Sequence, residues 1–125
     1  MTSRYDEIAS NLDRVREAVK SAATSAARKY EDITLIAVTK TFPVSDVHIL
    51  ASLDVHHYGE NRDSDAAPKA AAVPGTWHFQ GQIQSNKLKS IASWAHVIHS
   101  LDEVRHIDAL DKVAIHRIGV FLQVS

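Results

Sequence analysis

Short apolar runs rich in β-branched residues alternate with helix-type segments along the whole chain, and this alternation constrains the fold most. A helix is predicted over residues 3–29, because Ile8, Leu12, Val15 and Val19 recur at three- and four-residue intervals. Beyond it, the pattern predicts strands at 33–38, 55–58, 76–80, 95–99 and 118–124, and helices at 45–53, 61–72, 84–93 and 102–113. Such alternation is typical of an α/β protein with a parallel sheet of about five strands and right-handed crossovers.

Two architectures satisfy this pattern, an open doubly wound sheet and a (β/α) barrel, and periodicity alone does not separate them. The last predicted strand, 118–124, is almost entirely apolar, which is typical of a strand with neighbours on both edges. We therefore expect residues 1–125 to be a single incomplete domain. Its exposed edges could lead to self-association, and we expect Leu35, Ala37, Val120 and Leu122 to face the inside of a barrel.

Composition narrows the classes of protein. The formal net charge of -1 argues against a nucleic-acid-binding surface, which is normally strongly basic. No apolar run approaches the roughly 20 residues that a membrane-spanning helix needs. The N-terminus lacks an apolar secretory segment and the chain has no cysteine, so a cytoplasmic location is expected.

Lys40 is the first candidate for chemistry, since it follows the first predicted strand. In parallel α/β folds the carboxyl ends of the strands carry the active site. Partial desolvation there would favour the neutral amine that forms a Schiff base with an aldehyde. The alternative is an ordinary solvated lysine at the end of a strand.

Polar residues follow the next strands as well. Asn61 ends the second strand, where its amide could bind a ligand or cap the following helix. His78 lies in the third strand and shares a face with Gln80. After the fourth strand, Ser100 or Asp102 is interpreted as a helix cap rather than a ligand.

The eight histidines raise the question of a metal site. His56 and His57 are adjacent and point to opposite faces of a strand, and no HExxH motif or His-x-His pair with a carboxylate occurs. No metal site is therefore predicted. Nucleotide-binding motifs of the GxGxxG and GxxxxGK[ST] types do not occur in the sequence either.

Taken together, five segments resemble the pyridoxal phosphate homeostasis (YggS/PROSC) family, in the order and spacing of that family. They are Ala37-Val38-Thr39-Lys40-Thr41, Tyr58-Gly59-Glu60-Asn61, Trp77-His78-Phe79-Gln80-Gly81-Gln82-Ile83-Gln84-Ser85-Asn86-Lys87, Ile98-His99-Ser100-Leu101-Asp102 and Leu122-Gln123-Val124. The resemblance implies the N-terminal part of a (β/α)8 TIM barrel, of the type of the alanine racemase N-terminal domain. This sequence departs from the family pattern at Phe42, a position where many members have a second lysine.

The resemblance also implies a function. Pyridoxal 5'-phosphate (PLP) would be held as a Schiff base on Lys40, with Asn61 and His78 lining the cofactor pocket. The protein would then be a PLP carrier or homeostasis factor rather than an enzyme. The phosphate-binding segments of the family belong to its C-terminal half and are not expected in this chain. Two alternatives stay open, a fold-type-III PLP enzyme such as an amino-acid racemase and a non-catalytic fragment.

Overall fold

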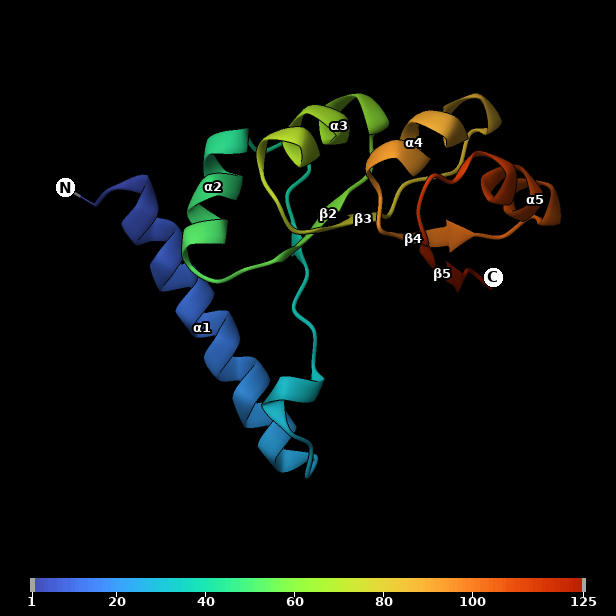
Figure 1. Cartoon of the computed structure of the whole chain (residues 1–125). Coiled ribbons are helices and arrows are strands. Elements are labelled where there is room, and N and C mark those ends of the chain that lie inside the picture. Colours follow the sequence, from blue (N-terminus) through green and yellow to red (C-terminus); the bar gives the residue numbers. More distant parts are fainter. Residues whose placement is uncertain (1, 125) are drawn as a thin grey trace.

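The computed structural model describes residues 2–124, which form five strands, five α-helices and two short 3-10 helices (Figure 1). In chain order they are α1 (Arg4–Ser25), η1 (Tyr30–Asp32), β1 (Ala37–Val38), α2 (Val44–Ser52), β2 (His57–Glu60), α3 (Asp63–Ala72), β3 (Thr76–Phe79), η2 (Ser85–Lys87), α4 (Leu88–Trp94), β4 (Val97–Leu101), α5 (Val104–Val113) and β5 (Gly119–Leu122). The predicted alternation of helices and strands is therefore confirmed. No helix within residues 2–124 is both long and apolar enough to cross a membrane.

The strands form one parallel sheet in the order β1-β2-β3-β4-β5. Each strand thus pairs with the next one in the chain, which is the strand order of a (β/α) barrel. A doubly wound sheet would instead reverse direction partway across. The strand order therefore distinguishes the barrel from the doubly wound sheet, which the sequence pattern alone did not do.

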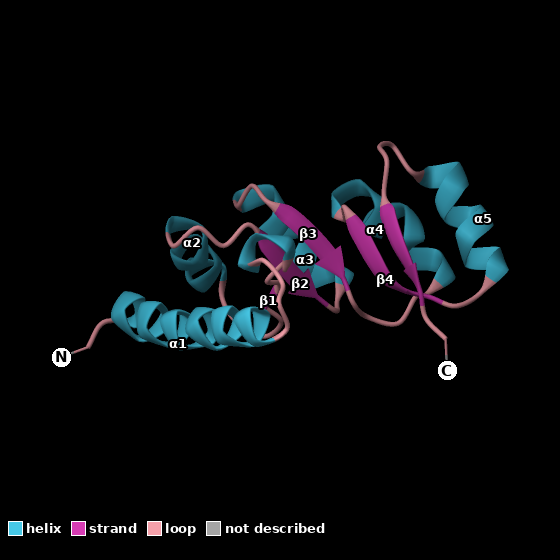
Figure 2. Ribbon diagram, turned by 90° about the horizontal axis from the view of Figure 1, so that it is seen from below, coloured by secondary structure: helices cyan, strands magenta, loops and turns pink. Residues whose placement is uncertain are grey.

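Helices α2, α3 and α4 cover one side of the sheet (Figure 1). Seen from below, the strands lie in front of α3 and α4 (Figure 2). The hydrophobic core fills the space between these two layers and includes the fully buried side chains of Tyr58, Trp77 and Ile98. The opposite side of the sheet, called the open face below, carries Val38 and Phe121, which are 51% and 59% exposed.

The expectation that Ala37 and Val120 face the inside of the barrel is wrong. Ala37 pairs with Tyr58, and Val120 pairs with Ile98. Paired residues of a parallel ladder point to the same side, so both side chains lie on the helix-covered side. The adjacent residues, Val38 and Phe121, occupy the open face instead.

Helix α1 begins where the sequence predicts and ends earlier. Ser3 and Asp6 form a capping box, in which the Ser3 hydroxyl accepts from the Asp6 backbone N–H. The helix ends at Ser25 rather than near residue 29, because Ala27 adopts the left-handed conformation (φ 55°).

Strand β1 is shorter than the predicted run at 33–38. Only Ala37 and Val38 pair with β2, although the Thr39 N–H continues the ladder by donating to the Gly59 carbonyl at 2.9 Å. Among the described strands β1 pairs with β2 alone, so it forms one edge of the sheet. Apolar residues upstream of it, such as Leu35, pack against the core without entering the ladder.

Candidate functional site

The register brings the three predicted site residues to the same region of the sheet. Val38 pairs with Gly59, and Gly59 pairs with His78, so these residues form one row across the open face. Lys40 and Asn61 each follow this row by two residues along their own chain segments. Neither residue lies in a paired strand, and both come directly after the carboxyl ends of β1 and β2.

Lys40 lies in a turn directly after β1 and is exposed. The turn is closed by the Phe42 N–H, which donates to the Thr39 carbonyl at 3.1 Å, and Thr41 has a positive φ of 69°. The partial desolvation expected from the sequence is not observed in residues 2–124. The ε-amine is instead accessible to a molecule in solution.

A buried ion pair supports the chain just before Lys40. Lys69 Nζ of α3 lies 3.0 Å from Glu60 Oε2 of β2 and donates to the Thr39 carbonyl, also at 3.0 Å. The Thr39 hydroxyl donates to the same Glu60 carboxylate. These bonds hold Thr39, at the end of β1, against β2 and α3. They therefore fix the position of the backbone from which Lys40 extends.

His78 is the centre of a chain of three histidines on the open face, called the histidine ladder below. Its Nε2 lies 3.0 Å from Nδ1 of His57, and its Nδ1 lies 2.8 Å from Nε2 of His99. The outer ring of His99 stacks on Phe121 of β5, with 4.9 Å between ring centroids. The ladder therefore connects three neighbouring strands, β2 to β4, and its contact with Phe121 extends to β5.

His78, at the centre of the ladder, is uncharged near neutral pH. Burial, with a smaller contribution from the imidazoles of His99 and His57, lowers the pKa of His78 to about 4. Burial also lowers the pKa of His99. The centre of the ladder is thus an uncharged hydrogen-bonding group on the open face of the sheet.

Sequence reasoning found His78 but did not connect it with His57 or His99. His57, His78 and His99 are spaced at 21 residues, and each lies on a strand. Metal-binding motifs place their histidines close together in sequence, so this longer period matches none of them. A repeat of 21 residues in a chain of βα units was the available signal.

Asn61 is exposed and lies beside the turn after β3. Arg62, not Asn61, is the N-cap of α3, so the interpretation of Asn61 as a helix cap is wrong. A Cβ at Gly81 would lie 2.3 Å from the Asn61 carbonyl oxygen, and glycine therefore permits this close approach. At Gly59 an added Cβ would lie 2.4 Å from the Gln80 amide oxygen, which places that amide over the open face.

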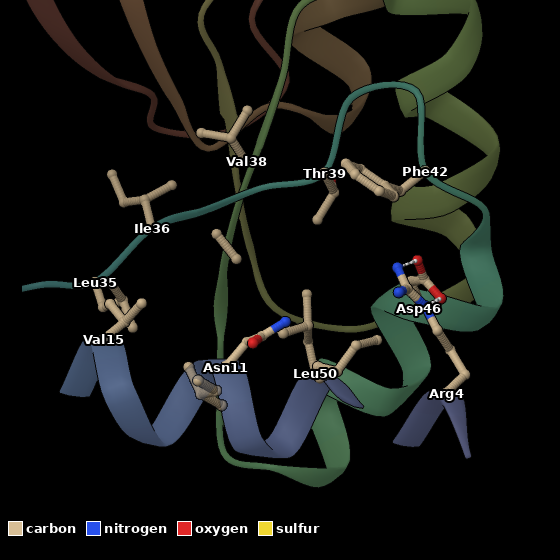
Figure 3. Close-up of a pocket in the computed structure, with 13 residues that line it drawn as sticks. Arg4, Asn11, Val15, Leu35, Ile36, Val38, Thr39, Phe42, Asp46 and Leu50 are labelled. Atoms are coloured by element: carbon tan, nitrogen blue, oxygen red, sulfur yellow. Dashed lines mark hydrogen bonds and ion pairs between the residues drawn. The ribbon is translucent and has the colours of Figure 1, made fainter. Parts of the chain in front are cut away.

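A separate cavity of about 360 Å³ lies between α1, β1 and α2, and it does not include Lys40 (Figure 3). Its walls are largely apolar, with Val15, Leu35 and Leu50 among them. At one end Arg4 donates to Asp46 through Nη2 at 2.7 Å and Nε at 3.1 Å. This pairing holds the pKa of the Asp46 carboxyl below its usual value and leaves no free reactive group at that end.

The fold and the residues at the carboxyl ends of its strands define a section of a parallel (β/α) barrel with an accessible lysine after its first strand. Proteins of similar sequence carry the name pyridoxal phosphate homeostasis protein. The protein from Mycobacterium tuberculosis is 38% identical over 98% of this chain and 56% of its own length. The protein from Escherichia coli is 36% identical over 80% of this chain and 45% of its own length. The chain belongs to the pyridoxal phosphate homeostasis family.

Solved structures agree with this assignment. PipY of Synechococcus elongatus, determined with PLP bound, is 29% identical with a TM-score of 0.64, over 76% of this chain and 47% of PipY. A protein described as unknown from Bifidobacterium adolescentis is 25% identical with a TM-score of 0.79, over 87% of this chain and 50% of its own. No family model matches the sequence. The chain spans about half the length of the curated relatives it matches.

Proposed function

We propose that the protein binds PLP and holds it as a Schiff base on Lys40, in the service of PLP homeostasis rather than of turnover. The observation that supports this proposal is that Val38, Gly59 and His78 pair in one row. Lys40 and Asn61 each follow that row by two residues along their own segments. The names of the relatives and the PLP bound to PipY support the choice of this ligand.

The residues present are suited to this ligand. An amine must lose its proton before it attacks an aldehyde, and the exposed amine of Lys40 can exchange that proton with solvent. His78 is neutral near neutral pH, so its ring can offer one donor and one acceptor to a bound ligand. The exposed apolar side chain of Val38, on the open face of β1, offers surface to an aromatic ring. Asn61 is accessible, and its amide can donate or accept a hydrogen bond.

Reductive trapping tests the proposal. The protein is incubated with one equivalent of PLP, reduced with borohydride and mapped by peptide mass spectrometry. We expect the label on Lys40 and its loss in Lys40→Ala. Lys89→Ala is the matched control, since Lys89 is an exposed lysine of α4, and it should be labelled as the wild type is. Label spread evenly over lysines such as Lys20 and Lys87 would contradict the assignment.

The alternative function is an amino-acid racemase. Racemases of this fold type need a second base opposite the lysine, typically a tyrosine. Within residues 2–124, Tyr58 lies on the helix-covered side and donates to the Val55 carbonyl, whereas Tyr5 and Tyr30 belong to α1 and η1. This arrangement favours a non-catalytic role. Chiral chromatography after incubation with L-alanine and PLP should show no racemisation above that of free PLP.

A further inference from the structure

Two carboxylates and a buried histidine converge at the beginning of α5. Asp102 and Glu103 immediately precede the helix, and His106 lies within its first turn. One ligand atom from each residue can be chosen such that all three lie within 4.8 Å of one another. None of these residues belongs to the proposed PLP site.

His106 is oriented as a metal-binding histidine is. The side chain is 4% exposed, and its Nε2 lies 3.1 Å from the Ser85 hydroxyl of η2. Its Nδ1 is buried, has no hydrogen-bond partner within residues 2–124, and lies 3.9 Å from Glu103 Oε2. When Nε2–H donates to Ser85, the lone pair of Nδ1 is available to a cation beside Glu103. The contact with Ser85 also fixes the ring.

Helix capping does not account for the carboxylates. Glu103 occupies the N-cap position of α5, and its side chain makes no capping hydrogen bond. The sequence interpretation of Ser100 or Asp102 as the cap is therefore wrong. A buried nitrogen lone pair beside two carboxylates is an unfavourable arrangement that a cation would relieve.

The surroundings also favour a cation. The three residues line a cavity of about 360 Å³ whose other walls carry no lysine or arginine side chain: Gln80, Gly81, Gln82, Ile83, Ser100 and Gln123. Glu103 does form an ion pair with Arg105, which is outside the cavity wall. Both partners are exposed, and an exposed ion pair is readily exchanged for another partner.

We propose that Asp102, Glu103 and His106 Nδ1 bind one divalent transition-metal ion, with Zn²⁺ as the best match. One imidazole nitrogen with two carboxylate oxygens is a donor set that zinc accepts in proteins. Magnesium prefers oxygen ligands alone and retains its water, so it binds more weakly here. The ion would join the loop after β4 to the first turn of α5, and through Ser85 to η2.

Equilibrium dialysis of the full 125-residue chain against ZnCl2 tests the site, with MgCl2 as the comparison. We expect one saturable Zn²⁺ per chain, with affinity lowered at least tenfold in Asp102→Asn and in Glu103→Gln. Ser85→Ala should weaken binding about tenfold, as is usual when the hydrogen-bond partner of a ligand is removed. His48→Gln, a change at an exposed histidine of α2, is the matched control and should bind as the wild type does.

His106→Gln should abolish binding, and circular dichroism must establish that this variant of a buried residue is folded. Asp102 and Glu103 are exposed, so their variants test the site even if His106→Gln unfolds. No saturable Zn²⁺ binding would overturn the proposal. Binding that Asp102→Asn and Glu103→Gln leave unchanged would also overturn it and would assign the zinc to other histidines.

Discussion

Lys69 Nζ lies 3.0 Å from Glu60 Oε2 between the sheet and α3, with side-chain exposures of 10% and 0%. The pair joins α3 to the carboxyl end of β2, and Lys69 also donates to the Thr39 carbonyl just after β1. Glu60 Oε1 has no hydrogen-bond partner within the described part of the chain. The stability of this region therefore depends on Lys69.

Lys69→Met should destabilise the protein by about 3–5 kcal/mol, because it leaves a buried carboxylate without a counter-charge. Urea unfolding followed by circular dichroism measures the difference. Adding Glu60→Gln to Lys69→Met should recover part of the loss, since the buried group is then neutral. Lys89→Met at an exposed position of α4 is the control, and an equal loss in that variant would contradict the explanation.

Stability should fall as the pH decreases from 6.5 toward about 4. His78 has a pKa of about 4 in the folded protein against an ordinary value of 6.5, so within this window the unfolded chain binds the proton more tightly. Each pH unit between the two values lowers the free energy of unfolding by up to about 1.4 kcal/mol. Below the folded pKa both states are protonated, and this contribution no longer changes.

Urea unfolding at several pH values within that window measures the slope. His78→Phe should reduce the slope, whereas His48→Gln at an exposed site of α2 should leave it unchanged. An unchanged slope in His78→Phe would assign the acid sensitivity to other groups. His96 and His99, whose pKa values are also lowered by burial, are the next candidates.

Two glycine substitutions of equal size should have unequal effects. Gly81→Ala would bring a Cβ to 2.3 Å from the Asn61 carbonyl oxygen, so the backbone must move. We expect it to destabilise the protein by about 1–3 kcal/mol, as overpacking does. Gly59→Ala meets the end of the Gln80 side chain, which can rotate away. Its free energy of unfolding should change less, and the reverse order in urea unfolding would contradict this reading of the contacts.

The chain should self-associate through β5. Every residue of this strand is exposed, with Phe121 at 59% and Leu122 at 65%, and within residues 2–124 it pairs with β4 alone. A charged residue on an edge strand opposes further pairing. Leu122→Lys should therefore shift sedimentation velocity profiles toward the monomer, whereas Ile115→Lys, an equally exposed change outside the strand, should not. Concentration-independent sedimentation of the wild type would refute the prediction.

The sequence predicts the order of elements well because each depends on local periodicity. The ends of elements are less predictable. Helix α1 ends because Ala27 adopts a left-handed backbone conformation. Strand β1 is short because only Ala37 and Val38 pair with β2. The barrel-type strand order depends on which strands pair with each other, and no single segment of the sequence encodes that pairing. Lys40 could be placed after β1 from the sequence, whereas the Glu60–Lys69 pair could not, because it forms only when α3 packs on the sheet.

The histidine ladder has a consequence for how a signal could cross the sheet. While His78 is neutral it has one ring N–H, so it donates to one neighbour and accepts from the other. With all three rings neutral, the hydrogens have two arrangements, both directed toward His57 or both toward His99. In either arrangement the outer nitrogens, Nε2 of His57 and Nδ1 of His99, have opposite character, one a donor and the other an acceptor. A molecule that selects the tautomer at one end thereby sets the tautomer at the other, two strands away, without displacing a heavy atom.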